Sequence, residues 1–571
     1  MSTSMWHVRA VSAGMTAFFF GTGLLVQGQD PAAGGLVEPV KREKEKQETC
    51  RIAGMVVKLA DGTPLKNATV RLENGEDREH TIAVKTTADG RYELRNVPSG
   101  RYKVKVTRNG YVEAEYGQRK PSDPGGTLAL APGENKERVN FKLIPAAVIA
   151  GRIFDEDGEP MPHAVVLVSR ETYHEGGKTL LSVTADRTND LGQFRLFGLA
   201  PGRYFVSAVQ NDEREVPGER EFMGGEKQGE KGYIKTYYPG TQDVAKASAI
   251  TVKEGEEVPG VDMQLKQVSV YRIRGRVFNQ ITHKGGSNAY LQLVSRSKRL
   301  EWDFGGGQEV LKPDGTFEFP NVAPGSYLLM AYWEDQGKFY STQEKIDIGE
   351  SDLEGVSLVI GSGATIPGHI RWEGKPSLER DELSVAIQPA ETPSWQGAAR
   401  VEANQQFTLK DVGDGDYKVV VNGLGKDCYI QDTLYGETHS AEGVISVGKA
   451  RGEHLEITIS SRGARAEGVV VDENGLPAPG VWVVAVPEEA KRTNFRLFKA
   501  QTTDQYGKFD LRGLAPGTYK LFSWTGIKNN SWEDGDFLKL FEEKGELVEL
   551  AEGDVKTVNL KAIETKGDQA E

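Results

Sequence analysis

The sequence predicts an all-β protein made of five antiparallel β-sandwich domains in tandem. In residues 502–521, Phe509 and Leu511 alternate with polar residues, the period of two expected of a strand with one buried face. Pro516 and Gly517 predict a tight turn to a second, adjacent strand, because proline presets the first central position and glycine accepts the left-handed second one. The pattern occurs four more times upstream, most weakly in the fourth copy, and every copy carries a tyrosine at the same place: Tyr102, Tyr204, Tyr327, Tyr417 and Tyr519. The spacing of these tyrosines is about one small domain.

Length and charge agree with this organisation. The chain has 571 residues, which suggests roughly four domains from length alone, and the repeats raise this to five. Its 67 glycines suit many short strands joined by tight turns. Asp and Glu total 83 against 70 Lys and Arg, a net charge of −13. This balance disfavours a nucleic-acid partner, since phosphate contacts need clustered basic side chains.

The N-terminus predicts export. Residues 1–28 read as a signal peptide, with His7 and Arg9 before an apolar stretch at 11–26 and small residues at the expected cleavage site. The apolar stretch is short and interrupted by glycine, so a membrane span is not favoured, although an uncleaved anchor stays open. No other segment is expected to span a membrane. The protein is therefore expected to be periplasmic, on the outer surface or secreted.

The repeats divide the rest of the chain. The predicted units are a linker at 29–49, sandwiches at 50–145, 146–267, 268–362, 363–460 (divergent) and 461–563, and a polar tail at 564–571. The second sandwich carries an insertion at 210–232 whose Gly- and Glu-rich composition favours disorder. Very short linkers between the units predict a semi-rigid row of beads.

Opening and closing strands can be placed in each unit by the same alternation. The expected opening strands are 52–59, 148–154, 271–278, 366–372 and 466–471, and the expected closing strands are 139–143, 261–265, 356–360, 457–459 and 555–560. Asp61-Gly62, residues 155–158 and Asn474-Gly475 predict hairpin turns after three of the opening strands. Leu538, Leu540 and Phe541 stand at helical spacing, which predicts a turn or two of amphipathic helix at 537–545.

The two cysteines do not form a disulfide framework. Cys50 and Cys428 fall in the first and fourth units. A bridge would require the fourth domain to fold back onto the first, so two separate thiols are the favoured interpretation, with the bridge left open.

These motifs resemble a known family. The order G-x-V-x-D-x-x-G-x-P-x-x-x-A-x-V followed by D-x-x-G-x-F-x-L-x-x-L-x-P-G-x-Y is similar to the carboxypeptidase regulatory-like domain, and residues 151–166, 190–204, 468–483 and 504–519 carry it clearly. The resemblance implies Ig-like, prealbumin-like (transthyretin-like) sandwiches of about seven strands. The whole chain also looks like secreted proteins of acidobacterial type that carry several copies of this domain. Such modules are generally non-catalytic, and some related sandwiches are classed with carbohydrate-binding folds.

No catalytic, metal or cofactor site is predicted. The eight histidines are scattered and form no H-E-x-x-H zinc motif, and the glycine patterns of a nucleophile elbow, a P-loop or a dinucleotide site are absent. Nucleophilic catalysis by Cys428 has only His439 near it in the chain. The acids at 155–159 suggest a Ca²⁺ loop, but a hairpin turn explains them and their counterparts at 61–62 and 472–475 more simply.

Aromatic residues offer the best functional signal. Flat aromatic faces stack on sugar rings, and the candidates for exposed sugar-binding side chains are Trp302, Trp333, Trp524 and Trp532. Packing at a domain end is the simpler interpretation of each of them. The repeated tyrosine is expected to be structural, with a buried ring and a hydroxyl that bonds to the backbone, as in a tyrosine corner.

Three hypotheses for function follow. The first is an exported, non-catalytic scaffold or binding protein of the cell envelope, with a protein partner. The second is a polysaccharide-binding protein that uses exposed tryptophans. The third, an uncharacterised hydrolase, has the least support, because function must be argued from a site.

Overall fold

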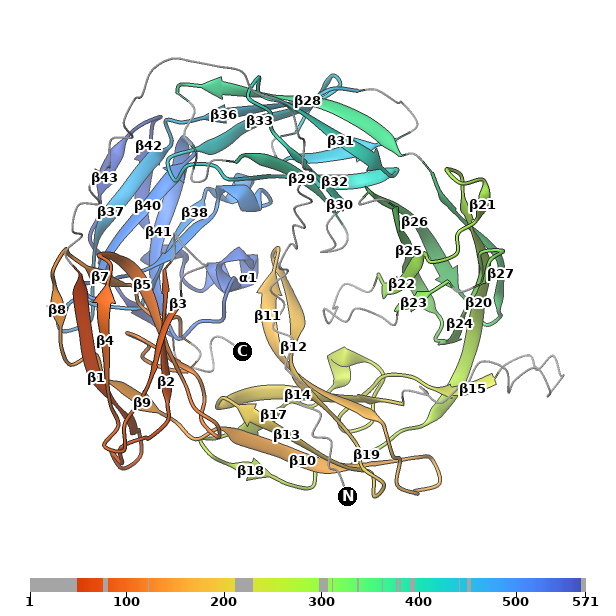
Figure 1. The fold of residues 1–571 in the computed structure, drawn as a ribbon, viewed down its shortest axis with the longest axis horizontal. Helices are drawn as coiled ribbons and strands as arrows, with labels where there is room; N and C mark the ends of the chain where they lie inside the picture. Colours follow the sequence, from red (N-terminus) through yellow and green to blue (C-terminus); the bar gives the residue numbers. More distant parts are fainter. Residues whose placement is uncertain are drawn as a thin grey trace, which may run out of the picture.

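Five β-sandwiches follow one another around a closed ring in the computed structural model (Figure 1). The structure describes residues 49–565, except 75–80, 122, 211–229, 297–306, 311, 336–337, 362, 376–377, 379–381, 391–395, 441 and 449–452. The predicted signal peptide and nearly all of the predicted linker, insertion and tail lie outside the described residues. Within the described part of the chain, no helix is long and apolar enough to cross a membrane.

Each sandwich is built from two sheets. The first has β1 (Cys50–Lys58), β4 (Arg91–Val97), β8 (Asn135–Lys136) and β9 (Phe141–Leu143) facing β2 (Thr69–Asn74), β3 (Thr81–Lys85), β5 (Gly100–Thr107), β6 (Ala114–Glu115) and β7 (Leu128–Leu130). The second has β10 (Ala147–Phe154), β13 (Gln193–Leu199), β18 (Glu257–Val258) and β19 (Met263–Gln264) facing β11 (Val165–His174), β12 (Gly177–Arg187), β14 (Gly202–Val209), β16 (Thr236–Tyr237) and β17 (Ile250–Val252).

The third and fourth sandwiches follow the same plan. The third has β15 (Glu230–Tyr233), β20 (Gln267–Asn279), β21 (Lys284–Gly285), β24 (Thr316–Val322) and β27 (Leu353–Ile360) facing β22 (Tyr290–Ser295), β23 (Gly307–Glu309), β25 (Gly325–Asp335) and β26 (Lys338–Ile348). The fourth has β28 (Ala364–Glu373), β31 (Gln406–Val412), β33 (Tyr429–Tyr435), β34 (Thr438–His439) and β36 (Leu455–Ser460) facing β29 (Ser384–Pro389), β30 (Gln396–Arg400), β32 (Gly415–Asn422) and β35 (Val444–Val447).

The fifth sandwich adds the helical segments. It has β37 (Ala464–Val471), β40 (Lys508–Leu514), β43 (Val555–Thr557) and β44 (Leu560–Lys561) facing β38 (Trp482–Pro487), β39 (Lys499–Thr502), β41 (Gly517–Thr525), β42 (Glu546–Leu550) and β45 (Ile563–Glu564). The described helices are α1 (Gly535–Lys539) and the short 3-10 turns η2 (Val244–Lys246), η3 (Glu489–Lys491), η4 (Phe495–Leu497), η5 (Ser531–Glu533) and η6 (Glu542–Lys544).

The same pattern of strand pairing recurs in all five units. The opening strand pairs antiparallel with the strand before the tight turn and parallel with the closing strand, as β37 does with β40 and β44. The tyrosine-bearing strand β41 pairs with β38 in the other sheet. The two strands of the repeated motif thus lie in different sheets, so the prediction that they are adjacent is wrong. The tight turn crosses from one sheet to the other, and Phe509 and Tyr519 enter one core from its two sides.

Three local details of the structure were not predicted. Residues 230–233, at the end of the predicted insertion, pair as β15 with β20 and thus extend the third sandwich. In the divergent fourth unit, β33 adds a strand on the outer side of the closing strand β36. In the predicted helical stretch, Phe537, Leu538 and Phe541 are buried whereas Leu540 is exposed.

The expected row of separate beads is wrong, because the chain closes on itself. The first and fifth sandwiches lie side by side (Figure 1), and an isolated parallel bridge pairs Thr127 with Asp504. The β11–β12 hairpin of the second sandwich points into the ring towards α1. Its tip contacts the fifth sandwich, where the Glu533 carboxylate accepts a hydrogen bond from the Glu175 N–H at 2.8 Å. The ring is thus held together by the contact between the first and fifth sandwiches and by the β11–β12 hairpin inside it, which we call the spoke.

Candidate functional site

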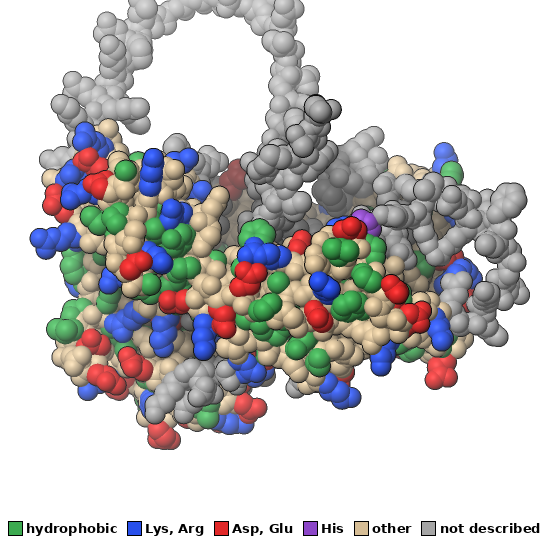
Figure 2. All heavy atoms as spheres, turned by 90° about the horizontal axis from the view of Figure 1, so that it is seen from below, with side chains coloured by type: hydrophobic (Ala, Val, Ile, Leu, Met, Phe, Trp, Pro, Cys, Tyr) green, Lys and Arg blue, Asp and Glu red, His purple; other side chains and the backbone are tan. Residues whose placement is uncertain are grey.

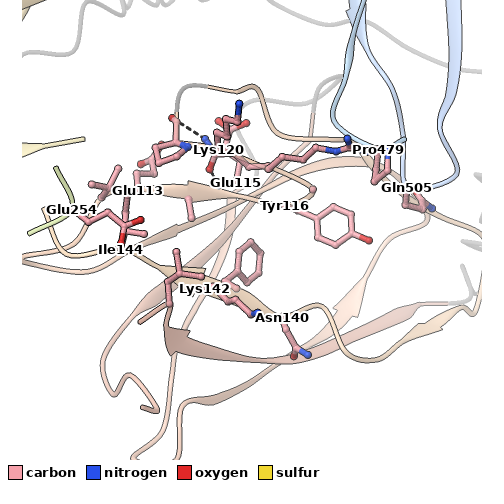
Figure 3. Close-up of a pocket in the computed structure, with 18 residues that line it drawn as sticks. Glu113, Glu115, Tyr116, Lys120, Asn140, Lys142, Ile144, Glu254, Pro479 and Gln505 are labelled. Carbon is pink, nitrogen blue, oxygen red and sulfur yellow. Dashed lines mark hydrogen bonds between the residues drawn. The ribbon is translucent and has the colours of Figure 1, made fainter. Parts of the chain in front are cut away.

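A cavity of about 610 Å³ lies at the junction of the first, second and fifth sandwiches (Figure 3). Most of its wall comes from residues 112–121, which follow β5, and from the closing segment 140–144 of the first sandwich. Glu254 comes from the second sandwich, and Pro479 and Gln505 come from the fifth. The cavity therefore has its full wall only when the ring is closed.

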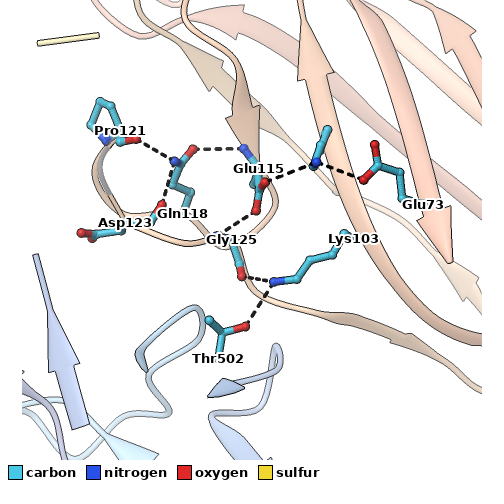
Figure 4. Close-up of polar contacts among 9 residues, drawn as sticks. Glu73, Lys103, Glu115, Gln118, Pro121, Asp123, Gly125 and Thr502 are labelled. Atoms are coloured by element: carbon cyan, nitrogen blue, oxygen red, sulfur yellow. Dashed lines mark hydrogen bonds and ion pairs between the residues drawn. The ribbon is translucent and has the colours of Figure 1, made fainter. Parts of the chain in front are cut away.

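Hydrogen bonds hold the loop that forms this wall (Figure 4). The Gln118 Oε1 accepts from the Glu115 N–H at 3.0 Å, and its Nε2 donates to the carbonyls of Pro121 and Asp123 at 3.1 and 2.9 Å. The Glu115 carboxylate accepts from the Gly125 N–H at 3.0 Å. These bonds satisfy backbone groups that would otherwise lose hydrogen bonds at the junction. The loop is consequently a fixed part of the first sandwich.

The same loop forms the contact with the fifth sandwich, which we call the latch and define as Lys103, Asp123, Gly125 and Ala129 with Thr502, Gln505 and Gly526. The side-chain amide of Gln505 pairs with the backbone of Ala129 as a neighbouring strand would. It donates to the Ala129 carbonyl and accepts from the Ala129 N–H, both at 3.1 Å. The Asp123 carboxylate accepts from the Gly526 N–H at 3.0 Å. Lys103 Nζ donates to the Gly125 carbonyl and, at 3.1 Å, to the Thr502 hydroxyl.

Close backbone approach at the latch requires glycine. A Cβ on Gly480 would stand 2.5 Å from the Gly117 carbonyl oxygen, and Gly480 has a φ of +67°, in the left-handed region. Side chains at this position would push the two sandwiches apart. The first and fifth sandwiches are thus shaped to fit each other.

Burial tunes two charged groups of the latch. It raises the pKa of Asp123, which is 5% exposed, while the Gly526 N–H opposes the shift. Burial also lowers the pKa of Lys103, whereas the nearby Glu115 carboxylate acts to raise it. Both shifts follow from the cost of moving a charge out of water.

The cavity wall carries balanced charge and few groups suited to nucleophilic catalysis. Its ionisable side chains, apart from Tyr116, are Glu113, Glu115, Glu254, Arg119, Lys120 and Lys142. The described lining residues include no serine, threonine, cysteine or histidine.

One zinc-like spacing does occur elsewhere, and sequence reasoning missed it. His439 and Glu442 stand in an H-x-x-E pattern in the fourth sandwich. His439 Nδ1 lies 2.7 Å from an Asp432 carboxylate oxygen, whereas Glu442 accepts a hydrogen bond from the Thr493 hydroxyl at 2.8 Å. Among the described residues, no three His, Cys, Asp or Glu side chains converge as metal ligands would.

The acids at 155–159 form a tight turn that an isolated antiparallel bridge between Phe154 and Pro160 closes, but the next strand, β11, lies in the other sheet, so the predicted hairpin between the two strands is wrong. An Asp155 carboxylate oxygen accepts from the N–H groups of Asp157 and Glu159 at 3.0 and 2.9 Å. Asp472 makes the equivalent bonds to Asn474 and Leu476. Aspartate stabilises these turns through its own backbone neighbours.

Two of the tryptophans predicted as sugar-binding candidates are buried. Trp524 is 0% and Trp532 is 3% exposed, so neither offers an exposed sugar-binding face, and the simpler interpretation, packing, describes both. The reason is a second apolar layer in the fifth sandwich, where Phe537, Leu538 and Phe541 cover the outer face of the sheet. Trp333 lies within β25, half-buried, with its ring 5.3 Å from that of Tyr340. Trp302 lies outside the described residues.

The five repeated tyrosines occupy one structural position. Each hydroxyl donates to the carbonyl four residues upstream: Tyr102 to Pro98, Tyr204 to Ala200, Tyr327 to Ala323, Tyr417 to Gly413 and Tyr519 to Ala515, at 2.8 to 3.0 Å. Four of the rings are buried, and that of Tyr327 is partly buried. This is the arrangement of a tyrosine corner, which closes the turn between the two sheets.

Basic and acidic side chains are interspersed with apolar ones over the face shown in Figure 2. That face has no continuous basic surface of the kind that tracks a phosphate backbone.

Comparison with known protein families gives a match for the first sandwich. Residues 51–144 match the model of the carboxypeptidase regulatory-like domain, as expected for the first sandwich. No curated protein matches the chain.

Several solved structures have low similarity to the chain. The Bacillus anthracis TIE protein is 16% identical, with 55% of this chain and 51% of that one covered and a TM-score of 0.15, so this chain spans about half its length. The minor pilin GBS52 of Streptococcus agalactiae is 14% identical, with 38% and 97% covered and a TM-score of 0.22. Two B repeat units of the collagen-binding protein of Staphylococcus aureus are 13% identical, with 72% and 100% covered and a TM-score of 0.12. Similarity this low carries no inference about function.

Proposed function

We propose that this protein is an exported, non-catalytic binding protein of the cell envelope, in which ring closure maintains one preformed binding cavity. The observation that carries the proposal is the composition of the cavity wall, which combines residues of the first, second and fifth sandwiches. A volume of about 610 Å³ is typical of small-molecule sites, which span roughly 300–1,000 Å³.

The latch supports this role because it fixes the cavity before any ligand arrives. A preformed site avoids the entropic cost of ordering loops on binding. The wall offers charged, amide and aromatic groups, and its described lining residues include no serine, threonine, cysteine or histidine, while Tyr116 carries a phenolic hydroxyl. The same considerations place a hydrolase below a binding protein.

Solution scattering tests the closed ring. The purified protein is expected to have the compact pair-distance distribution of a ring, rather than the long tail of five beads in a row. The double variant Asp123→Ala and Gln505→Ala removes three interdomain hydrogen bonds and should shift the distribution towards longer distances. Gln264→Ala serves as control, because its amide bonds only within the second sandwich. An extended distribution for the unaltered protein would overturn the proposal.

Cell fractionation tests export. The protein is expected in the envelope or the medium, and a cytoplasmic location would contradict that part of the proposal.

A further inference from the structure

We infer that the junction cavity binds a neutral, hydroxyl-rich ligand, namely a short segment of an uncharged oligosaccharide. The inference rests on the proposed function and names the ligand class of its cavity. Three properties of the wall carry it: its charge balance, the kind of hydrogen-bonding groups left available, and an apolar side that includes one aromatic ring.

The charges on the wall sum to zero. Glu113, Glu115 and Glu254 oppose Arg119, Lys120 and Lys142. A phosphate or polyanionic ligand would meet as many carboxylates as cations, and so would a cationic ligand, so either would face like charges. A ligand without net charge avoids both penalties.

The groups available to a ligand include donors and acceptors. Glu113, Lys120, Lys142 and Glu254 line the cavity (Figure 3), and all four residues are exposed to water. The Asn140 Oδ1 accepts from the Met55 N–H at 2.9 Å, which leaves its amide N–H groups as donors. A hydroxyl both donates and accepts, so a polyhydroxylated ligand can satisfy such a mixed set.

Other polar groups of the wall are already engaged. The amides of Gln118 and Gln505 hold the loop and the latch, and Glu115 is bonded to Gly125. These residues shape the cavity rather than contact a ligand through free polar atoms. The polar contacts therefore come from the periphery of the cavity, where water-exposed charged groups can reorient around a neutral ligand.

An apolar side completes the site. Val112, Phe141 and Ile144 contribute apolar groups to the lining, and the Tyr116 ring lies between Asn140 and Pro479 in Figure 3. Sugar rings present C–H groups on one face and hydroxyls at the edge, so they match an aromatic and aliphatic wall with polar groups beside it. A fatty acyl chain would leave these polar groups without partners.

Calorimetry with the full chain tests the ligand class. The probes are neutral trisaccharides of glucose, mannose and xylose, the acidic trimer of galacturonic acid, and a tetrapeptide with one lysine and one glutamate. At least one neutral probe is expected to bind, and Tyr116→Leu and Lys142→Ala should each weaken it about tenfold, a change of roughly 1.4 kcal/mol. Tyr290→Ala is the matched control, because Tyr290 is 49% exposed on β22, in the third sandwich.

The outcomes separate the two proposals. Stronger binding of the acidic trimer or the peptide than of every neutral probe would overturn the ligand class, as would a neutral ligand whose affinity is unchanged in both variants. Failure of all neutral probes, with scattering that shows a closed ring, would also overturn the ligand class while the closed-ring proposal stands. An open ring in scattering would overturn the proposed function itself.

Discussion

Each repeated tyrosine lies where the chain crosses from one sheet to the other. Its ring packs into the core, and its hydroxyl bonds to a carbonyl of the preceding turn, at 3.0 Å for Tyr519 and Ala515. A buried carbonyl without a partner costs free energy, so ring and hydroxyl stabilise the same corner. The chain uses this device five times.

Removal of the Tyr519 hydroxyl tests the corner. Tyr519→Phe is expected to lower the free energy of unfolding of the fifth sandwich by about 0.5–1.5 kcal/mol, the usual net value of one hydrogen bond. Tryptophan fluorescence during urea unfolding is a suitable probe, because Trp524 and Trp532 are buried in that sandwich. Tyr290→Phe, at an exposed position, should change nothing measurable. An unaltered midpoint for Tyr519→Phe would contradict the role of the hydroxyl.

The same residue predicts alkaline sensitivity. Burial, with a smaller contribution from Tyr429, raises the pKa of Tyr519 to about 12 from its ordinary value of 10.0. Between these values the folded state keeps a proton that the unfolded state has lost, so stability falls as pH rises from 10 to 12. Urea unfolding across this range should show a shallower decline for Tyr519→Phe than for the unaltered protein, and equal slopes would argue against the shift.

At the scale of elements, the β11–β12 hairpin links three sandwiches. Glu175 forms an ion pair with Lys418 of the fourth sandwich, and Glu171 pairs with Lys528 of the fifth at 3.0 Å. Burial raises the pKa of Glu533, which accepts the Glu175 N–H. A two-stranded hairpin alone is marginally stable, so these contacts and the hairpin support each other.

A double-mutant cycle measures the spoke. Glu175→Gln and Lys418→Met are expected to couple by about 0.5–1 kcal/mol, because the pair is only partly exposed, and the coupling should shrink in high salt. The control pair is Asp536 and Lys539, with side chains 91% and 72% exposed, for which no measurable coupling is expected. Equal values for the two cycles would show that the spoke adds nothing beyond a surface ion pair.

At the scale of the whole molecule, ring closure decides which distant residues meet. It joins the first sandwich to the fifth, whereas Cys50 and Cys428 are buried in the separate cores of the first and fourth. Neither forms a disulfide. Because, among the described residues, the first sandwich contacts the fifth and not the fourth, the sulfurs of Cys50 and Cys428 stay apart.

Thiol counting checks this arrangement. We expect two reactive thiols per chain after denaturation without reductant, and slow reaction in the native state because Cys50 is 1% and Cys428 5% exposed. Recovery of no thiols after denaturation would indicate a bridge and a different path of the chain.

Much of the fold follows from local patterns. Alternation in β40 and β41, the aspartate turns and the repeated tyrosine depend on residues within one or two turns of each other, which is why the five sandwiches are predictable. The pairing of these two strands was not, since the same alternation and turn suit a hairpin within one sheet and a crossing between two. Packing was the simpler interpretation of Trp524 from the sequence, but the layer that covers it could not be identified there, because that layer comes from a separate segment around Phe537.

The sequence by itself determined the number of sandwiches, their turns and the structural role of the tyrosines. Only the tertiary structure decided that the row closes into a ring and that a cavity forms where it closes. The physical reason is distance along the chain: Gln505 meets the backbone of Ala129, 376 residues away. No local period encodes such a contact, because it depends on the summed orientation of every sandwich between them.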